Sequence, residues 1–124
     1  MIQEAYCSYK IGKLLLEKGY DGPVEQVYNE DGTGSTPTHI GNWRAKSKIP
    51  KITHQMAMAW LREVHNLYID ITFDSKDYYV VDIYDMVKTD DYGSPYHYPP
   101  TIANCKTYEE AVEAACAYVL KILI

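Results

Sequence analysis

The amino-acid sequence predicts a single α+β domain over residues 1–124, with helices and strands in the order α-β-β-α-β-β-α. Three segments have the spacing of amphipathic helices, and two pairs of segments show the alternation of apolar and polar residues that is typical of strands. With 124 residues and 47% hydrophobic content, the chain can bury one core. Because each helix has one apolar face to cover, we expect a mainly antiparallel four-stranded sheet with the helices packed on one of its faces.

The first helix and the first hairpin are predicted in the first half of the chain. Residues 3–18 have helical spacing, and Gly19 is placed to end the helix. The apolar face of this helix carries Cys7, Ile11, Leu14 and Leu15. Residues 24–28, VEQVY, have strand character, and residues 29–35, NEDGTGS, contain the Asp-Gly pair of a tight turn. We therefore expect a hairpin that returns through about residues 38–43.

The second helix and the second hairpin have the clearest patterns. A helix is predicted over residues 53–64, and Thr53 can cap its amino end. Its buried face is expected to carry Met56, Ala57, Trp60, Leu61 and Val64. Asn66 can end the helix in a left-handed conformation. Residues 67–73 and 78–86 then alternate as two strands of an antiparallel hairpin.

A long connection separates this hairpin from the last helix. It contains residues 92–100, YGSPYHYPP, whose prolines exclude a regular helix and disfavour a central strand. Thr107 and Glu110 then have the spacing of a capping box. We expect the last helix to run from there to the carboxyl terminus.

Charge and hydropathy restrict the classes of partner. The net charge is -5, so the chain as a whole repels nucleic-acid phosphates and anionic membrane surfaces. The first ten residues, MIQEAYCSYK, do not have the pattern of a signal peptide, and no stretch approaches the apolar length of a transmembrane helix. We expect a cytoplasmic protein.

Short motifs in the second and last helices resemble those of a known group of proteins. They are HQ at residues 54–55, WLREVH at 60–65, YEEA at 108–111 and EA at 113–114. With the alternating hairpin between them, they resemble a group of small uncharacterised proteins encoded by phages and mobile elements of gut bacteroidetes. The resemblance covers roughly residues 50–124 and implies a bacterial or phage cytoplasmic context. It implies no activity and no functional residues.

Side chains that could carry catalysis or bind metal do not form a motif. The three cysteines are odd in number and widely separated, which predicts free thiols. The four histidines lack the spacing of metal ligands and are interpreted as surface or capping residues. Asp70 and Asp82 alternate with apolar positions and are interpreted as solvent-facing strand residues. We expect no enzymatic activity, no metal and no cofactor.

Tyrosine is the compositional outlier, with 13 residues against one phenylalanine. Tyrosine gives a large contact area at a small entropic cost, which favours interfaces. The predicted interaction surface carries Tyr68, Tyr78, Tyr84, Tyr92, Tyr96, His97 and Tyr98. A second interpretation is that residues 92–100 fold back over the sheet edge and pack their tyrosines on Tyr68 and Tyr84. Both interpretations are compatible with the sequence.

A basic segment supports an alternative function. Residues 43–51 combine an aromatic ring with cations that could hold single-stranded nucleic acid. The residues concerned are Trp43, Arg44, Lys46, Lys48 and Lys51. Charge runs more often form solvated linkers. The second half also loosely resembles a double-stranded RNA-binding domain, but a third strand is not predicted and Glu109 and Glu110 open the last helix, where that family has lysines.

The sequence as a whole favours a non-catalytic interaction module of phage or mobile-element type. We expect its tyrosine-rich surface to bind a protein partner or a second copy, as in a homodimer. A nucleic-acid-binding module is the alternative.

Overall fold

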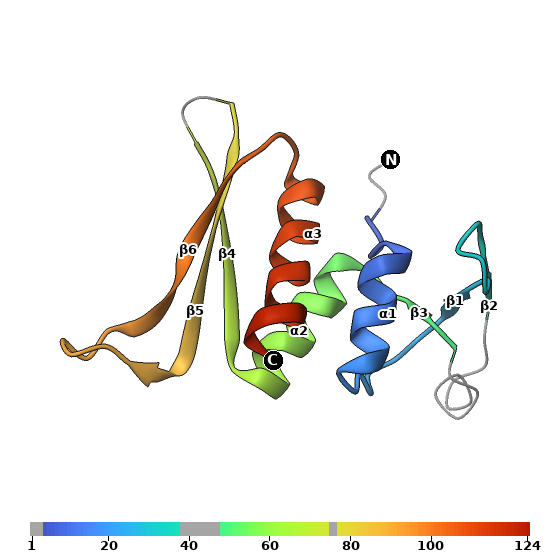
Figure 1. Ribbon diagram of the computed structural model, residues 1–124, viewed down its shortest axis with the longest axis horizontal. Helices are drawn as coiled ribbons and strands as arrows, with labels where there is room; N and C mark the ends of the chain where they lie inside the picture. The colour runs from blue at the N-terminus through green and yellow to red at the C-terminus, as the bar shows by residue number, and fades with distance from the viewer. Residues whose placement is uncertain (1–3, 38–47, 75–76) are drawn as a thin grey trace. The chain divides into compact units, whose positions relative to one another are not determined.

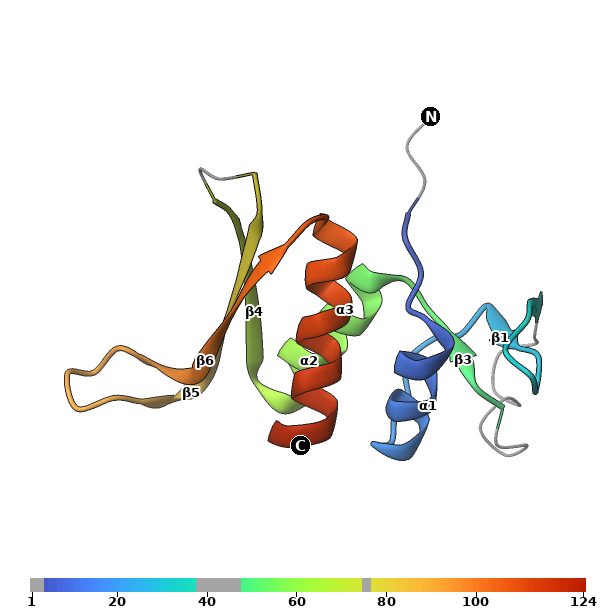
Figure 2. The ribbon, with the colours of Figure 1, turned by 45° about the horizontal axis from the view of Figure 1, so that its top comes forward.

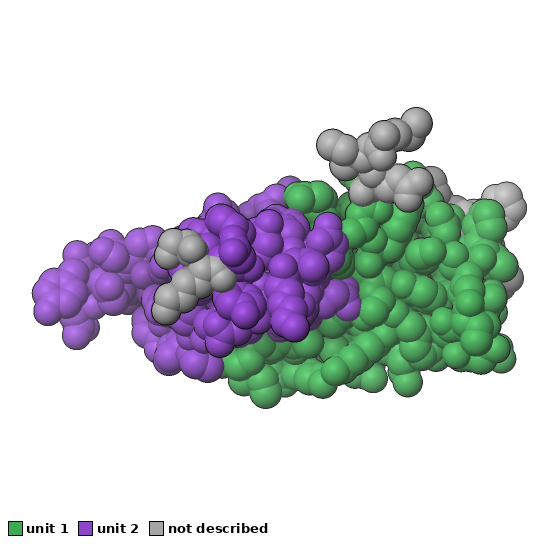
Figure 3. Space-filling model, turned by 90° about the horizontal axis from the view of Figure 1, so that it is seen from above, with its two compact units in different colours: residues 1–57, 117–124 green, residues 58–116 purple. Residues whose placement is uncertain are grey.

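The chain falls into two compact units (Figure 3). The structure, a computed structural model, describes residues 4–37, 48–74 and 77–124. Unit 1 comprises residues 1–57 and 117–124, and unit 2 comprises residues 58–116. The prediction of a single domain stays a prediction.

The α+β class is confirmed, but the predicted sheet is wrong. Within the described residues there are three α-helices and two three-stranded antiparallel sheets, β2-β1-β3 and β4-β5-β6 (Figure 1). Neither a four-stranded sheet nor the order α-β-β-α-β-β-α is present in this part of the chain. The structure differs from the prediction in two places. It has short strands around the first hairpin and an additional long strand before the last helix.

Helix α1 (Tyr9–Glu17) in unit 1 begins later than its periodicity predicted. Ser8 is extended and its side chain accepts a hydrogen bond from the first turn, so it is the amino-terminal cap. The residues before it pair with another segment: the Cys7 amide donates to the Ile52 carbonyl at 2.8 Å. The helix ends as predicted at Gly19, which has a φ of 85°.

The sheet of unit 1 is small. Strand β1 (Gln26–Tyr28) lies between β2 (Ser35–Pro37) and β3 (Pro50–Lys51). The tight turn forms as predicted, with Gly32 at a φ of 78°. The return strand predicted over residues 38–43 lies outside the described residues.

Helix α2 (His54–His65) has the predicted cap, since the Thr53 side chain accepts a hydrogen bond from the Met56 amide at 3.2 Å. The buried positions include Ala57, Met58, Trp60 and Leu61. Val64 is 52% exposed, so its predicted place in the core is wrong. His54, which was interpreted as a surface or capping residue, directly follows the cap Thr53 and is 5% exposed.

The second hairpin of the sequence is confirmed in unit 2. Strand β4 (Leu67–Phe73) pairs with β5 (Tyr79–Thr89) in an unbroken antiparallel register. Asn66 precedes it with a φ of 58°, as expected for the end of a helix. Alternate residues of the hairpin are buried: Leu67, Ile69, Val81 and Ile83. Figures 1 and 2 both show α2 and α3 on one side of the sheet, so these residues mark the face that the helices cover.

Strand β6 (Pro95–Cys105) occupies the segment that was predicted to be an irregular connection. It pairs antiparallel with β5 and forms an edge of the sheet. Prolines are tolerated at an edge, because a residue without an N–H can face away from the ladder. The register with β5 shifts at three places, which absorbs residues that do not fit a regular ladder. Proline therefore excludes a central strand here without excluding a strand.

Helix α3 (Tyr108–Tyr118) begins at the predicted cap. The Thr107 hydroxyl accepts a hydrogen bond from the Glu110 amide at 3.0 Å, and the Glu110 carboxylate accepts one from the Lys106 amide at 3.1 Å. A π-helical segment, η1 (Val119–Leu123), continues the helix toward the carboxyl terminus.

In the part of the chain that the structure describes, no helix is long and apolar enough to cross a membrane.

Candidate protein-interaction surface

Three aromatic side chains form a row across the sheet face opposite the helices of unit 2. Tyr68 lies opposite Tyr84 on the neighbouring strand, and Tyr84 lies opposite His97 on the next. Residues directly opposite each other share a face of the sheet. The rings of Tyr84 and His97 are 5.0 Å apart. Because Tyr68 is 44% exposed and the His97 side chain is 39% exposed, this aromatic row is open to solvent.

Two carboxylates lie beside the aromatic row. Asp70 and Asp82 are directly opposite each other on the same face. Asp82 Oδ1 accepts a hydrogen bond from the Thr101 hydroxyl at 2.7 Å and lies 2.9 Å from His97 Nε2. Strand β6 therefore fixes Asp82 in place. Like charges directly opposite each other destabilise a sheet, so a cation above this acidic pair, Asp70 and Asp82, would relieve their repulsion.

Tyr96 and Tyr98 belong to the other side of the sheet. Tyr98 lies opposite the buried Ile83, and its hydroxyl donates to Asp85 Oδ2 at 2.8 Å. The Tyr96 ring lies 4.9 Å from the Tyr98 ring, and Lys88 Nζ lies 4.1 Å above it. Both tyrosines make contacts within the sheet. The residues of the predicted interaction surface therefore do not all lie on one face.

Hydrogen bonds around Asp85 shift the pKa values of two side chains, Asp85 and Tyr98. Amide donation from Lys88 and Val87, followed by the Tyr98 hydroxyl, holds the pKa of Asp85 below its ordinary value. The same hydrogen bond to Asp85, with burial second, raises the pKa of Tyr98. The pair therefore favours an ionised carboxylate and a neutral phenol.

The remaining predicted tyrosines lie apart from the aromatic row. Tyr78 precedes β5, is half-buried, and its carbonyl accepts a hydrogen bond from the Asp74 amide at 2.6 Å. Tyr92 lies in the turn between β5 and β6 and is 94% exposed. The Asp90 carboxylate accepts hydrogen bonds from the Tyr92 and Ser94 amides at 2.9 and 3.0 Å, which orders the turn. Tyr92 is thus displayed at the tip of a hairpin.

The structure describes only part of the basic segment, so its role as a binding site stays a prediction. Trp43, Arg44 and Lys46 lie outside the described residues. Lys48 lines a hollow, whereas Lys51 is engaged within unit 1. The Lys51 Nζ lies 4.9 Å from the centre of the Tyr6 ring and 5.7 Å from that of Tyr28, and it donates to Ser35 Oγ at 3.1 Å.

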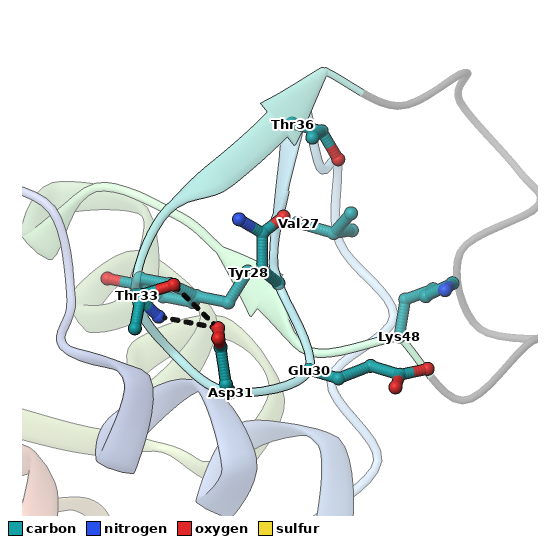
Figure 4. Close-up of a pocket in the computed structure, with 8 residues that line it drawn as sticks. Val27, Tyr28, Glu30, Asp31, Thr33, Thr36 and Lys48 are labelled. Carbon is teal, nitrogen blue, oxygen red and sulfur yellow. Dashed lines mark hydrogen bonds between the residues drawn. The ribbon is translucent and has the colours of Figure 1, made fainter.

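The hollow beside Lys48 has a volume of about 490 Å³ and is formed around the turn after β1 (Figure 4). Its lining carries two carboxylates, Glu30 and Asp31. Asp31 already accepts hydrogen bonds from the Thr33 hydroxyl and amide, and these bonds lower the pKa of Asp31. Small-molecule sites have polar groups that converge on a ligand. The described lining of this hollow does not show such a set, and we assign no ligand to it.

Sequence reasoning named His97 for the interaction surface but missed Thr101, and it placed neither residue beside Asp82. Alternation alone placed Asp70 and Asp82 outward, but the contact of Asp82 with Thr101 and His97 requires the β5–β6 register. The third strand also completes the α-β-β-β-α order of a double-stranded RNA-binding domain, although Glu109 and Glu110 still open the last helix.

Comparison of the chain with protein-family models, with curated proteins and with solved structures finds no match in any of the three.

Proposed function

We propose that this protein is a non-catalytic interaction module that binds a basic segment of a protein partner on the open face of the β4-β5-β6 sheet. The observation that carries the proposal is the aromatic row, Tyr68, Tyr84 and His97, beside the acidic pair, Asp70 and Asp82. We further propose a bacterial or phage cytoplasmic context for such a module, which is supported by the resemblance of the helix motifs to proteins of phages and mobile elements.

The chemistry of the face selects a cationic partner. A Lys or Arg side chain over a tyrosine ring gains about 0.5–1 kcal/mol at an exposed site. This chain already contains such contacts, with Lys51 over Tyr6 and Lys88 over Tyr96. A cation above Tyr68 would also be near the acidic pair, so ring and carboxylates would act on the same group. An arginine fits this arrangement well, because its planar guanidinium can stack on a ring and bind a carboxylate.

The same face disfavours nucleic acid. Aromatic rings on a sheet can stack with bases, but binding also requires cations that follow the phosphates. Here the groups beside the rings are carboxylates, and the net charge of the chain is -5. The helix that begins with Glu109 and Glu110 is acidic as well. A protein partner therefore accounts for the surface better than RNA or DNA.

A titration with defined probes tests this function. An arginine-containing peptide, a glutamate-containing peptide of the same length and a single-stranded oligonucleotide would be added to isotopically labelled protein, and backbone amide shifts would be followed by NMR. We expect the arginine peptide alone to bind, with the largest shifts in β4, β5 and β6, and with an affinity that falls as salt is added.

Two single substitutions locate the binding. Tyr68→Ser removes an exposed ring of the aromatic row, and Tyr92→Ser removes the more exposed ring at the hairpin tip. We expect the first to weaken binding of the arginine peptide and the second to leave it unchanged. Equal effects of the two substitutions, or tighter binding of the oligonucleotide, would contradict the proposal.

A further inference from the structure

The two edges of the β4-β5-β6 sheet differ in their protection against pairing with another chain. At one edge, β6 contains Pro95, Pro99 and Pro100, and its register shifts three times. At the other edge, β4 has the sequence LYIDITF, with no proline or lysine, and pairs with β5 without a bulge. Prolines, bulges and charged side chains, lysines above all, are among the devices that prevent edge-to-edge pairing, and of these β4 has only one charged residue, Asp70. Among the described residues, β4 has a strand neighbour on one side only.

The hydrogen bonds at the two ends of the β4–β5 ladder show which groups of β4 face this edge. The Met86 amide donates to the Asn66 carbonyl at 2.7 Å, and the Asp74 amide donates to the Tyr78 carbonyl at 2.6 Å. In an antiparallel pair the direction of the backbone groups alternates along each strand. Even-numbered residues of β4 therefore direct their N–H and C=O groups toward β5. The groups of the odd-numbered residues point to the open edge: Leu67, Ile69, Ile71 and Phe73.

We propose that β4 pairs antiparallel with β4 of a second copy of this chain, about a two-fold axis at Ile71. The pairing would form a continuous six-stranded sheet, three strands from each copy. Each copy presents the same edge, so the contact is self-complementary. The main-chain groups of Ile71 pair across the axis, and those of Ile69 pair with those of Phe73.

Charge selects this register over its neighbour. An axis at Asp70 would place the two Asp70 carboxylates opposite each other, in a pair whose Cα atoms are about 4.5 Å apart. That arrangement is destabilising. An axis at Ile71 places Asp70 opposite Thr72 of the second copy, twice, and a threonine hydroxyl can donate to a carboxylate. It also brings the Phe73 ring, which is 58% exposed, beside Ile69 of the second copy.

The protected edge explains why pairing would stop at two copies. After the β4 edges have paired, the new sheet ends in β6 on both sides, and the prolines there disfavour further addition of strands. The result is a closed dimer and not a fibre. The pairing uses the edge of the sheet and leaves its open face free, so it goes beyond the proposed function and does not depend on it.

A matched pair of substitutions at Phe73 tests the use of the edge. Phe73→Pro removes an outward N–H, while Phe73→Ala keeps that N–H and loses the ring. Neither removes a main-chain bond to β5. Sedimentation equilibrium should give a dimer for the natural chain and for Phe73→Ala, and a monomer for Phe73→Pro. A natural chain that stays monomeric up to about 1 mM, or a Phe73→Pro variant that stays dimeric, would overturn the proposal.

Charge substitutions at Thr72 test the register, and they also decide the matter if the proline variant does not fold. Thr72 is exposed, and Thr72→Asp would face Asp70 of the second copy twice, which should weaken dimerisation roughly tenfold. Thr72→Lys would form two opposite-charge pairs and should keep or tighten the dimer. Thr89→Asp adds the same charge outside the pairing region and serves as the control. Equal dimerisation of Thr72→Asp and Thr72→Lys would exclude this register.

Discussion

The Tyr98 hydroxyl donates a 2.8 Å hydrogen bond to Asp85 across the β5–β6 pair. The Asp85 carboxylate also accepts hydrogen bonds from the amides of Val87 and Lys88 at 2.9 and 2.7 Å. One carboxylate thus connects β6 to the outer half of β5. Because the contact depends on an ionised carboxylate and a neutral phenol, the stability of the hairpin should depend on pH at both extremes.

The acid side of this dependence should belong to Asp85. Its pKa is held below the ordinary value of 3.8, so the folded state binds fewer protons than the unfolded state. The contribution of Asp85 is complete above 3.8 and is lost as the pH falls through the lower, folded pKa. Urea unfolding should show a stability deficit of Asp85→Asn at neutral pH that shrinks in acid. The exposed Asp91→Asn, in the same hairpin, controls for loss of a charge, and parallel profiles of Asp85→Asn and the natural chain would contradict the prediction.

The alkaline side should belong to Tyr98. Its pKa is raised above the ordinary value of 10.0, so its contribution is complete below that pH and is lost as the pH rises through the folded value. Burial also raises the pKa of Tyr20 to about 12, so the natural chain loses stability in alkali for two reasons. We therefore expect the difference in stability between Tyr98→Phe and the natural chain to shrink above pH 10.0. The loss of stability due to Tyr20 should persist in both proteins. Unfolding experiments on both proteins in a series of alkaline buffers measure this difference in stability.

Trp60 should be a major contributor to stability. It is 7% exposed, and truncation of a buried tryptophan leaves a cavity that the surrounding side chains fill only in part. We expect Trp60→Ala to lower the free energy of unfolding by about 3–5 kcal/mol in urea denaturation. Val64→Ala, at a 52% exposed position of the same helix, should change it by less than about 0.5 kcal/mol. A loss below about 1 kcal/mol for Trp60→Ala would show that this position is not part of the core.

The second helix and the β4–β5 hairpin could be predicted because the signals that define them are local. Thr53 and Asn66 mark the ends of the helix, and strict alternation marks the strands. Val64 was placed wrongly because it belongs to the last turn before Asn66, where helical spacing no longer specifies what the side chain contacts.

The other elements depend on partners that are distant in sequence. The start of α1 is set by pairing of Cys7 with Ile52, which helical periodicity cannot reveal. Strand β6 was missed because its prolines disfavour a strand in general, whereas the actual constraint concerns only the direction in which an N–H must point. Because β6 was missed, its residues could not be assigned to a face of the sheet in the predicted interaction surface. Outward positions of Tyr68 and Tyr84 followed from alternation, but the place of His97 beside them followed only from the register of β6.

The three thiols should react only when the chain unfolds. Cys7 and Cys116 are 0% exposed and Cys105 is 5% exposed. Burial raises the pKa of Cys116 to about 12, with a smaller contribution from Glu113, and burial followed by Glu110 raises the pKa of Cys105. Because the thiolate is the reactive form, we expect alkylation by iodoacetamide to be slow in the native protein and complete in urea, as followed by mass spectrometry. Rapid native labelling of Cys105 would instead indicate an activated thiol.

Substitutions in the tyrosine segment, residues 92–100, should separate a tyrosine that stabilises the hairpin from one that does not. Tyr98→Phe removes the hydroxyl that binds Asp85, and a net hydrogen bond contributes about 0.5–1.5 kcal/mol, so we expect a loss of that size. Tyr92→Ser affects a side chain that is 94% exposed and should change the free energy of unfolding by less than about 0.5 kcal/mol. A double-mutant cycle with Asp85→Asn isolates the first effect: Tyr98→Phe should cost much less once the carboxylate is gone. Additive losses would mean that the Tyr98 hydroxyl stabilises the hairpin through an interaction other than the hydrogen bond to Asp85. Unchanged stability in both tyrosine variants would mean that neither side chain stabilises the hairpin. That result would favour the interpretation of residues 92–100 as a contact surface.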